Sequence, residues 1–125
     1  MSLVLAGCGW TLPLTCSPNE HPVFIETLYF GTAKPGGTVA ASEWESFVHN
    51  FVMPEFPEGL SSWEASGRWR MATGIVEQEV SHVLQLTHDG NKKHDTAIQS
   101  LMQTYEHKYQ QEAVMRIRSQ GCRSF

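Results

Sequence analysis

Two stretches of the chain have the hydrophobic and polar patterns of β-strands. Residues 23–31, VFIETLYFG, are rich in β-branched and aromatic side chains and end at a glycine, which is typical of a strand. Residues 60–71, LSSWEASGRWRM, alternate more regularly, with Trp63 and Trp69 on the more apolar side. We therefore expect a second, half-buried strand whose Trp63 and Trp69 side chains belong to the core.

Two other stretches place apolar residues three and four positions apart, which predicts amphipathic helices. The first helix is expected near residues 42–56, with Ser42 and Glu45 at the spacing of a capping box and prolines at its end. The second is expected near residues 92–110. The apolar stripes consist of Trp44, Phe47, Val48, Phe51 and Val52 in the first helix, and of Ile98, Leu101, Met102, Tyr105 and Tyr109 in the second.

Alternation returns in residues 80–88, VSHVLQLTH, and 112–119, EAVMRIRS, and predicts two more strands. The resulting order, β-α-β-β-α-β, is that of an α+β, ferredoxin-like fold. We expect a four-stranded antiparallel sheet with strand order 4-1-3-2 and two helices on one face. Residues 1–22 contain three prolines and no periodic pattern, so they are predicted to be a leader, and residues 23–125 a single domain.

Composition narrows the class of protein. The chain has 125 residues, enough for one domain with its own core. Its formal net charge of −4 argues against a nucleic-acid partner, because proteins that bind phosphate backbones are usually basic. A membrane partner is expected only through a lipid anchor, because no apolar run approaches the roughly 20 residues that span a bilayer.

Four of the five arginines lie on the polar side of the second and fourth predicted strands, and this side is expected to form the sheet face without helices. Guanidinium groups bind carboxylates and phosphates bidentately, so the pattern suggests a site for a small anionic ligand. The two strands are opposite edges of the sheet, so a dimer stacked face to face would be needed to bring both pairs together. The alternative is that the charges keep exposed edges from pairing. These residues are Arg68, Arg70, Arg116 and Arg118.

Two residues of the first strand are further candidates for this site. Tyr29 is expected on the open face with Thr27, because Leu28 and Phe30 suit the core. Glu26 then points toward the helices, where a carboxylate needs either a partner or a raised pKa. The alternative is that Glu26 lies outside the edge of the core.

The histidines and acids near the turn at residues 88–95 allow two further interpretations, and we adopt neither. His88, Asp89, His94 and Asp95 could meet around a metal ion, but a solvated turn beside a helix N-terminus explains them as well. Ser81, His88 and Asp89 have the residue types of a catalytic triad, but the sequence has no nucleophile-elbow motif around Ser81. No metal, no cofactor and no catalytic residue is predicted.

Several segments together resemble a known family. They are ETLYFG (26–31), PEFPEGL (54–60), GRWR (67–70), VLQLTHD (83–89) and YEHKYQQEAVMRIR (105–118). Their order and spacing resemble the bacterial domain of unknown function 3574 over about residues 24–125. Membership implies a small exported or lipid-anchored bacterial protein, whose relatives often end in a cysteine followed closely by Ser-Phe, as CRSF does here. The family has no established activity, so the resemblance implies no mechanism.

The three cysteines indicate the cellular compartment of the protein. Cys8 follows Leu-Ala-Gly, as at the cleavage site of a bacterial lipoprotein signal, although the preceding segment is short and lacks a basic start. If Cys8 carries a lipid, Cys16 and Cys122 remain as a pair. An antiparallel neighbour relation between the first and last strands would bring them to the same end of the sheet. We therefore predict a Cys16–Cys122 disulfide in a periplasmic or outer-membrane-anchored lipoprotein; three reduced thiols in a cytosolic protein are the alternative.

The sequence thus predicts a non-catalytic, extracytoplasmic module for ligand binding or assembly, dimeric through the open sheet face. The alternative is a small dimeric ferredoxin-like enzyme with a pocket at the sheet or at the dimer seam, by analogy of fold alone.

Overall fold

The structure of the protein is a computed structural model that describes residues 15–125. Cys8, the predicted lipid attachment site, lies outside these residues, as does most of the leader. In chain order the elements are strand β1 (His21–Gly31), the short strands β2 (Ala33–Lys34) and β3 (Gly37–Thr38), helix α1 (Ala41–Phe47), the π-helical turn η1 (Val48–Val52), strands β4 (Ser61–Arg70) and β5 (Val76–His88), helix α2 (Lys92–Lys108) and strand β6 (Met115–Arg123).

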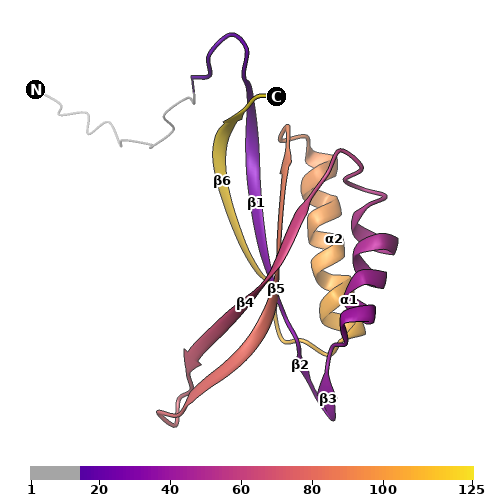
Figure 1. Cartoon of the computed structure of the whole chain (residues 1–125), viewed down its shortest axis with the longest axis vertical. Helices are drawn as coiled ribbons and strands as arrows, with labels where there is room; N and C mark the ends of the chain where they lie inside the picture. Colours follow the sequence, from indigo (N-terminus) through magenta and orange to yellow (C-terminus); the bar gives the residue numbers. More distant parts are fainter. Residues whose placement is uncertain (1–14) are drawn as a thin grey trace, which may run out of the picture.

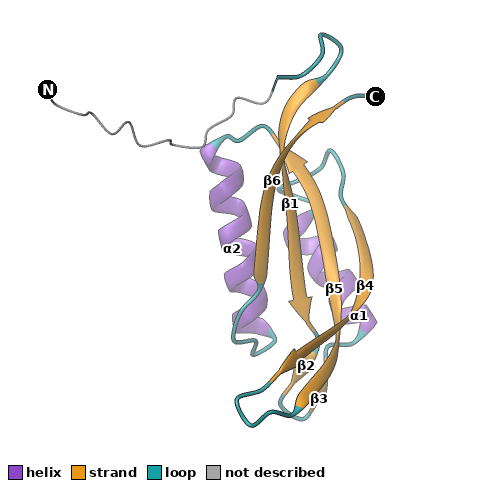
Figure 2. Cartoon of the chain, turned by 90° about the vertical axis from the view of Figure 1, so that its left-hand side faces the viewer, coloured by secondary structure: helices purple, strands orange, loops and turns teal. Residues whose placement is uncertain are grey.

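The four long strands form one antiparallel sheet in the order β4-β5-β1-β6, and β2 and β3 form a separate small ribbon. Both helices lie against one face of the sheet (Figure 1). Figure 2 looks onto the opposite face, which no helix of the described chain covers. The predicted α+β architecture and its strand order are therefore confirmed.

The core lies between the sheet and the helices, and Phe30 of β1 is at its centre. Its ring contacts Trp44 and Phe47 of α1 and Tyr105 of α2, with ring centroids 5.1, 5.7 and 4.8 Å away. All four side chains are buried, and Trp44 thus has the core position that the sequence predicted. Leu28, Leu84 and Ile98 complete the contact between the layers.

The helix boundaries differ slightly from the sequence prediction. The first helix starts at Ala41 rather than Ser42, and the carboxylate of Glu43 accepts a hydrogen bond from the backbone N–H of Ala40 at 2.8 Å. The predicted capping role of Ser42 is therefore wrong, because the Glu43 side chain caps the first turn of the helix. Helix α1 continues into η1, whose last residue is two positions before Pro54. The second helix is capped by Asn91, whose side chain accepts a hydrogen bond from Lys93 N.

The pairing register assigns each strand residue to a face, because directly opposed residues in antiparallel strands point to the same side. Leu28, which faces the core, pairs with Leu84 on β5 and with Arg116 on β6. Glu26 pairs with Leu86 and with Arg118. Arg116 and Arg118 therefore lie on the helix-covered face, and the prediction that they face the open side is wrong.

The side chains of strand β4 also face the opposite way from the prediction. Trp63 pairs with Val83, which in turn pairs with Tyr29 on the open face. The side chains of Trp63 and Trp69 are 46% and 44% exposed, so their predicted core position is wrong. The alternate residues, including Arg68 and Arg70, point to the side of the sheet that carries the helices. There the β4–β5 hairpin extends past the helices, so both of its faces meet solvent (Figure 1).

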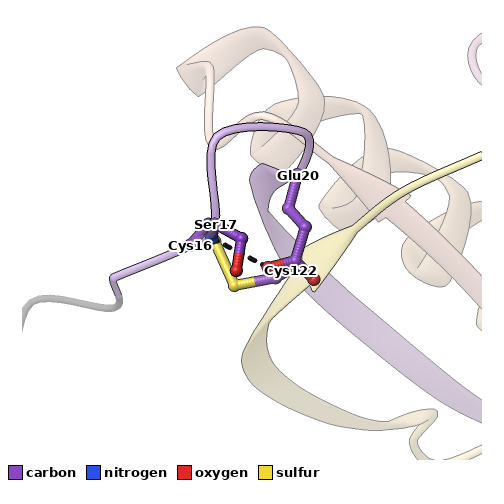
Figure 3. The surroundings of a disulfide bond; sticks show 4 residues. All are labelled: Cys16, Ser17, Glu20 and Cys122. Atoms are coloured by element: carbon purple, nitrogen blue, oxygen red, sulfur yellow. Dashed lines mark hydrogen bonds between the residues drawn. A yellow bond between two sulfur atoms is a disulfide. The ribbon is translucent and has the colours of Figure 1, made fainter.

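A disulfide joins the two ends of the described chain. Cys16 and Cys122 are bonded with their Cα atoms 5.6 Å apart, as predicted (Figure 3). Cys122 lies within β6, opposite Pro22 of β1, so the bond attaches the segment before β1 to the edge strand. In that segment the backbone N–H of Ser17 donates a hydrogen bond to the Glu20 carboxylate at 2.8 Å. No helix in the described part of the chain is long and apolar enough to span a membrane.

Candidate functional site

Glu26, a predicted site residue, is fully buried on the central strand β1, with a relative accessibility of 0%. Its carboxylate receives hydrogen bonds from three side chains. Arg116 donates from Nε to Oε2 at 2.8 Å and from Nη2 to Oε1 at 2.6 Å, and Arg118 donates from Nε to Oε1 at 2.9 Å. The third donor is His88, 3.0 Å from Oε1. The partner that a buried carboxylate at this position requires is therefore present.

These bonds determine the charge of Glu26. Burial alone would raise the pKa of the carboxyl, but the hydrogen bonds from Arg116, His88 and Arg118 outweigh burial and lower the pKa to about 2. Glu26 is thus ionised at neutral pH, and it holds the pKa of Arg116 above its ordinary range in return. The cluster is a permanent set of charges rather than a group poised to exchange a proton.

Asp95 at the first turn of α2 completes the charge balance. Its Oδ1 accepts hydrogen bonds from Nη2 of Arg116 at 2.7 Å and from Nη2 of Arg118 at 2.6 Å. Two carboxylates thus neutralise two guanidinium groups, and the network ties β1, β6 and α2 together. Because their donors already serve carboxylates, Arg116 and Arg118 offer little to an external anion in this arrangement. We call Glu26, His88, Asp95, Arg116 and Arg118 the Glu26 network.

His88 connects this network to the surface. The backbone N–H of Gly90 donates to His88 Nδ1 at 3.0 Å, so that nitrogen is an acceptor. The ring proton therefore lies on Nε2, which donates to Glu26. Phe24 stacks on the same ring with centroids 5.6 Å apart. Both nitrogens and one side of the imidazole are thus held by the protein.

An open cleft of about 480 Å³ lies beside His88. Its walls are residues 54–59, which connect η1 to β4, together with the end of β5 and the start of α2. The lining mixes both signs of charge, with Lys93 and Arg123 against Glu55, Glu58 and Asp89. This mixture selects no single class of charged ligand.

The histidines at this cleft do not fit a metal site in their present arrangement. Ligand atoms of His88, Asp89 and His94 lie within 4.8 Å of one another. However, both ring nitrogens of His88 already have hydrogen-bond partners, and His94 Nδ1 lies 2.9 Å from Asp89 Oδ1. His88 would have to release Gly90 or Glu26 before it could bind an ion.

The remaining predicted site residues lie apart from the Glu26 network. Tyr29 is on the open face, where the sequence placed it, and its side chain is partly exposed. Arg68 and Arg70 are exposed on the β4–β5 hairpin and form no ion pair with any residue that the structure describes. The four arginines therefore form two separate pairs, and binding of an anionic ligand to any of them stays a prediction.

The open face instead gathers apolar side chains. One row crosses all four strands through directly paired residues, and we call it the Trp63 row: Trp63, Val83, Tyr29 and Met115. Met115 and the neighbouring Ile117 are 53% and 49% exposed, as apolar side chains in a core would not be.

Comparison with known proteins identifies the family. The model of the family described as protein of unknown function (DUF3574) matches residues 26–125. The chain belongs to this family. The match begins at Glu26 and includes every member of the Glu26 network. No curated protein matches the sequence.

One solved structure similar to this DUF3574 domain is a phage SAM lyase in complex with S-methyl-5'-thioadenosine. The superposition has a TM-score of 0.60 and covers 92% of this chain and 97% of the lyase, at 12% sequence identity. Similarity at this level shows a shared fold, and the lyase activity is not carried over to the present chain.

Sequence reasoning missed two members of the Glu26 network, His88 and Asp95. It weighed Asp95 only as a metal ligand and His88 as a metal ligand or a triad member, although it placed Glu26 toward the helices and in need of a partner. The neighbour relation between the first and last strands was an available signal for Arg118, which it puts directly opposite Glu26. Strand pairing does not identify His88 or Asp95, because Glu26 pairs with Leu86 on β5 and Asp95 is on α2.

Proposed function

We propose that this domain is an assembly module that forms a homodimer by stacking the open sheet faces of two copies. The observation that carries the proposal is the Trp63 row, an apolar band that reaches from one edge of the sheet to the other. Its ends, Trp63 and Met115, are 46% and 53% exposed, Tyr29 is partly exposed, and Val83 is buried between them. Exposed apolar patches of this kind mark interaction surfaces in proteins that are otherwise soluble.

A second copy is the occupant that the chemistry of this face favours. Four successive rows of open-face residues contain no charged side chain. Charged groups meet these rows only at two places on their border, where Arg123 donates a hydrogen bond to Thr87 and the Glu79 carboxylate lies beside Gly31. An uncharged face is compatible with itself under a two-fold axis, where each residue meets its symmetry-related neighbours. The residues of these rows are Ile25, Thr27, Tyr29, Gly31, Ser61, Trp63, Ala65, Ser81, Val83, Gln85, Thr87, Met115, Ile117 and Ser119.

The size of the face is close to that of a specific contact. Four strands and four rows give a flat footprint of roughly 500 Å² from standard sheet spacings. The protruding indole and thioether side chains add accessible surface to this footprint. A stable interface buries about 800 Å² on each partner, so the open face approaches the size that a dimer needs.

The disulfide supports an extracytoplasmic location for this module, because disulfides persist in oxidising compartments. Lipid attachment at Cys8 is part of the same proposal and would hold the domain near a membrane. Mass spectrometry of the protein isolated from membranes of its bacterial host tests both points. A lipid mass on Cys8 and a Cys16–Cys122 crosslink are expected, and an unmodified Cys8 in membrane-free fractions contradicts the anchor.

Sedimentation equilibrium of the 125-residue chain tests the dimer. The wild type should shift from monomer to dimer between micromolar and millimolar concentration. Met115→Glu places a charge in the Trp63 row and should leave a monomer. Ile75→Glu is the matched control, because Ile75 is also exposed but lies at the tip of the β4–β5 hairpin.

Circular dichroism establishes that each variant is folded. A wild type that stays monomeric at millimolar concentration contradicts the proposal. A dimer that survives Met115→Glu but is lost in Ile75→Glu would assign the contact to the hairpin instead.

A further inference from the structure

A second pocket lies on the helix-covered side, away from both the Glu26 network and the open face. It has a volume of about 320 Å³ and is formed by the β2–β3 ribbon, the start of α1 and the facing parts of β4 and β5. Its walls combine four small apolar residues with six polar ones. The lining residues are Thr32, Ala33, Thr38, Val39, Ala41, Glu64, Gln78, Glu79, Val80 and His82.

His82 is the unusual member of this set. Its relative accessibility is only 7%, and its ring stacks on Trp44 with centroids 4.4 Å apart and planes 4° from parallel. Within the described residues, neither ring nitrogen of His82 forms a hydrogen bond, and neither is completely shielded from solvent. The imidazole is thus mostly buried, but its unpaired nitrogens can be reached from the pocket, where they can exchange water for a ligand.

Both charged residues that line the pocket are acidic. Glu64, directly opposite His82 in the β4–β5 ladder, and Glu79 both line it, whereas none of the ten lining residues is Lys or Arg. Glu79 Oε1 accepts the backbone N–H of Ala33 at 2.6 Å. Glu64 forms no hydrogen bond or ion pair with another described residue, so its charge is available to a ligand.

We propose that this pocket binds a small organic cation, a primary ammonium group attached to a short apolar or aromatic body. The ammonium group donates one hydrogen bond to a ring nitrogen of His82 and lies near the carboxylate of Glu64. The apolar body contacts Val39 and Val80 in the walls. An anionic ligand would meet two carboxylates and no cationic side chain, which disfavours it.

The protonation of His82 agrees with this arrangement. Burial lowers the pKa of the imidazole, against the opposing influence of the Glu64 and Glu45 carboxylates. At neutral pH the ring is therefore uncharged, and it offers a lone pair that can accept a hydrogen bond from an ammonium group.

Three probes of similar size and different charge provide the test: phenethylammonium, 2-phenylethanol and phenylacetate. Each is titrated into the isotopically labelled 125-residue protein while backbone and imidazole NMR signals are followed. Phenethylammonium should give saturable shifts at His82, Val80 and Thr38, whereas the alcohol should bind more weakly and phenylacetate most weakly. Added salt should weaken the cation's binding, because the attraction to Glu64 is partly exposed to solvent.

Two variants separate the contributions of the two side chains. His82→Phe retains an aromatic ring against Trp44 but removes both ring nitrogens, and it should weaken phenethylammonium binding about tenfold. Glu64→Gln alters an exposed side chain, leaves the core intact, and should weaken binding about threefold. Glu55→Gln, a carboxylate outside the pocket, is the control and should bind as the wild type does.

Three results would overturn the proposal. They are the absence of saturable shifts at the pocket residues, equal binding of phenylacetate and phenethylammonium, and unchanged binding in Glu64→Gln. The last result is informative even if His82→Phe fails to fold.

Discussion

Arg116 donates two hydrogen bonds to the carboxylate of Glu26, from Nε to Oε2 at 2.8 Å and from Nη2 to Oε1 at 2.6 Å. The two residues lie 90 positions apart in the chain, on the neighbouring strands β1 and β6. This bidentate pair, together with Arg118, His88 and Asp95, fixes the last strand and the second helix to the centre of the sheet. A buried pair of this kind makes stability sensitive to pH and to the loss of either partner.

Glu26→Gln should reduce the acid sensitivity of the fold. The pKa of Glu26 is lowered from its ordinary 4.5 to about 2, so ionised Glu26 stabilises the folded state above about pH 4.5. This contribution, roughly 3 kcal/mol, is lost progressively as pH falls toward 2. Urea unfolding of Glu26→Gln should show lower stability at neutral pH and a shallower decline in acid.

Glu55→Gln is the control for this titration, because Glu55 is exposed and outside the network. It should follow the wild type at every pH. An acid decline in Glu26→Gln as steep as that of the wild type contradicts the assignment, although Asp95, whose pKa is also lowered, leaves a smaller slope in both.

Arg116→Met should destabilise the protein by roughly 3 to 5 kcal/mol, because it leaves the buried Glu26 charge with one arginine fewer. Arg68→Met removes the same group from the exposed β4–β5 hairpin, and it should change the free energy of unfolding by no more than about 0.5 kcal/mol. Chemical denaturation of both variants at neutral pH measures the difference. Equal, small effects would mean that the Glu26 network adds nothing to stability.

The fold could be predicted from the sequence because its signals are local. The helical stripe around Trp44 and the apolar strand from 23 to 31 each require burial, and the order of elements then limits the topology to few choices. The disulfide followed from that topology, because adjacent first and last strands bring residues 16 and 122 to one end of the sheet.

The orientation of two strands could not be predicted in the same way. Alternation shows that the residues of β4 and β6 have two sides, but it does not show which side meets the helices. The more apolar side was assigned to the core, and in both strands that side, with Trp63 in β4 and Ile117 in β6, is on the open face. In β6 the arginines face inward because Glu26 and Asp95 neutralise them, which is a tertiary interaction without a local signal.

Cys16→Ser should lower the free energy of unfolding by up to about 4.7 kcal/mol, because the crosslink closes a loop of roughly 100 residues. Cys8→Ser is the matched control and should leave stability unchanged. Both are compared with the wild type by urea unfolding under oxidising conditions. With a reductant present, the wild type and Cys16→Ser should become equal, and a difference that persists there would mean that the serine itself perturbs the fold.

Gly90→Ala should destabilise the protein more than Gly74→Ala. Both glycines have φ of +87°, so alanine costs about 1 kcal/mol of backbone strain at either position. A Cβ at position 90 would lie 2.5 Å from Cε2 of Phe24, whereas one at position 74 meets nothing within 4 Å. The clash should add roughly 1 to 3 kcal/mol.

Gly90→Ala should also disturb His88, because the backbone N–H of Gly90 donates a hydrogen bond to His88 Nδ1. Urea unfolding measures the stability of both variants, and imidazole NMR signals report on His88. Equal destabilisation of the two variants contradicts the close contact with Phe24.

His82 should titrate below the ordinary histidine pKa of 6.5, because burial against Trp44 disfavours the imidazolium form. The carboxylates of Glu64 on β4 and Glu45 on α1 oppose this effect, so Glu64→Gln should lower the pKa further. Glu55→Gln should leave it unchanged. Since the folded-state pKa is below the unfolded one, protonation of His82 costs stability as pH falls through this range. NMR titration of the His82 ring carbons measures all three values, and a wild-type pKa at or above 6.5 contradicts the buried, unpaired imidazole on which the cation site depends.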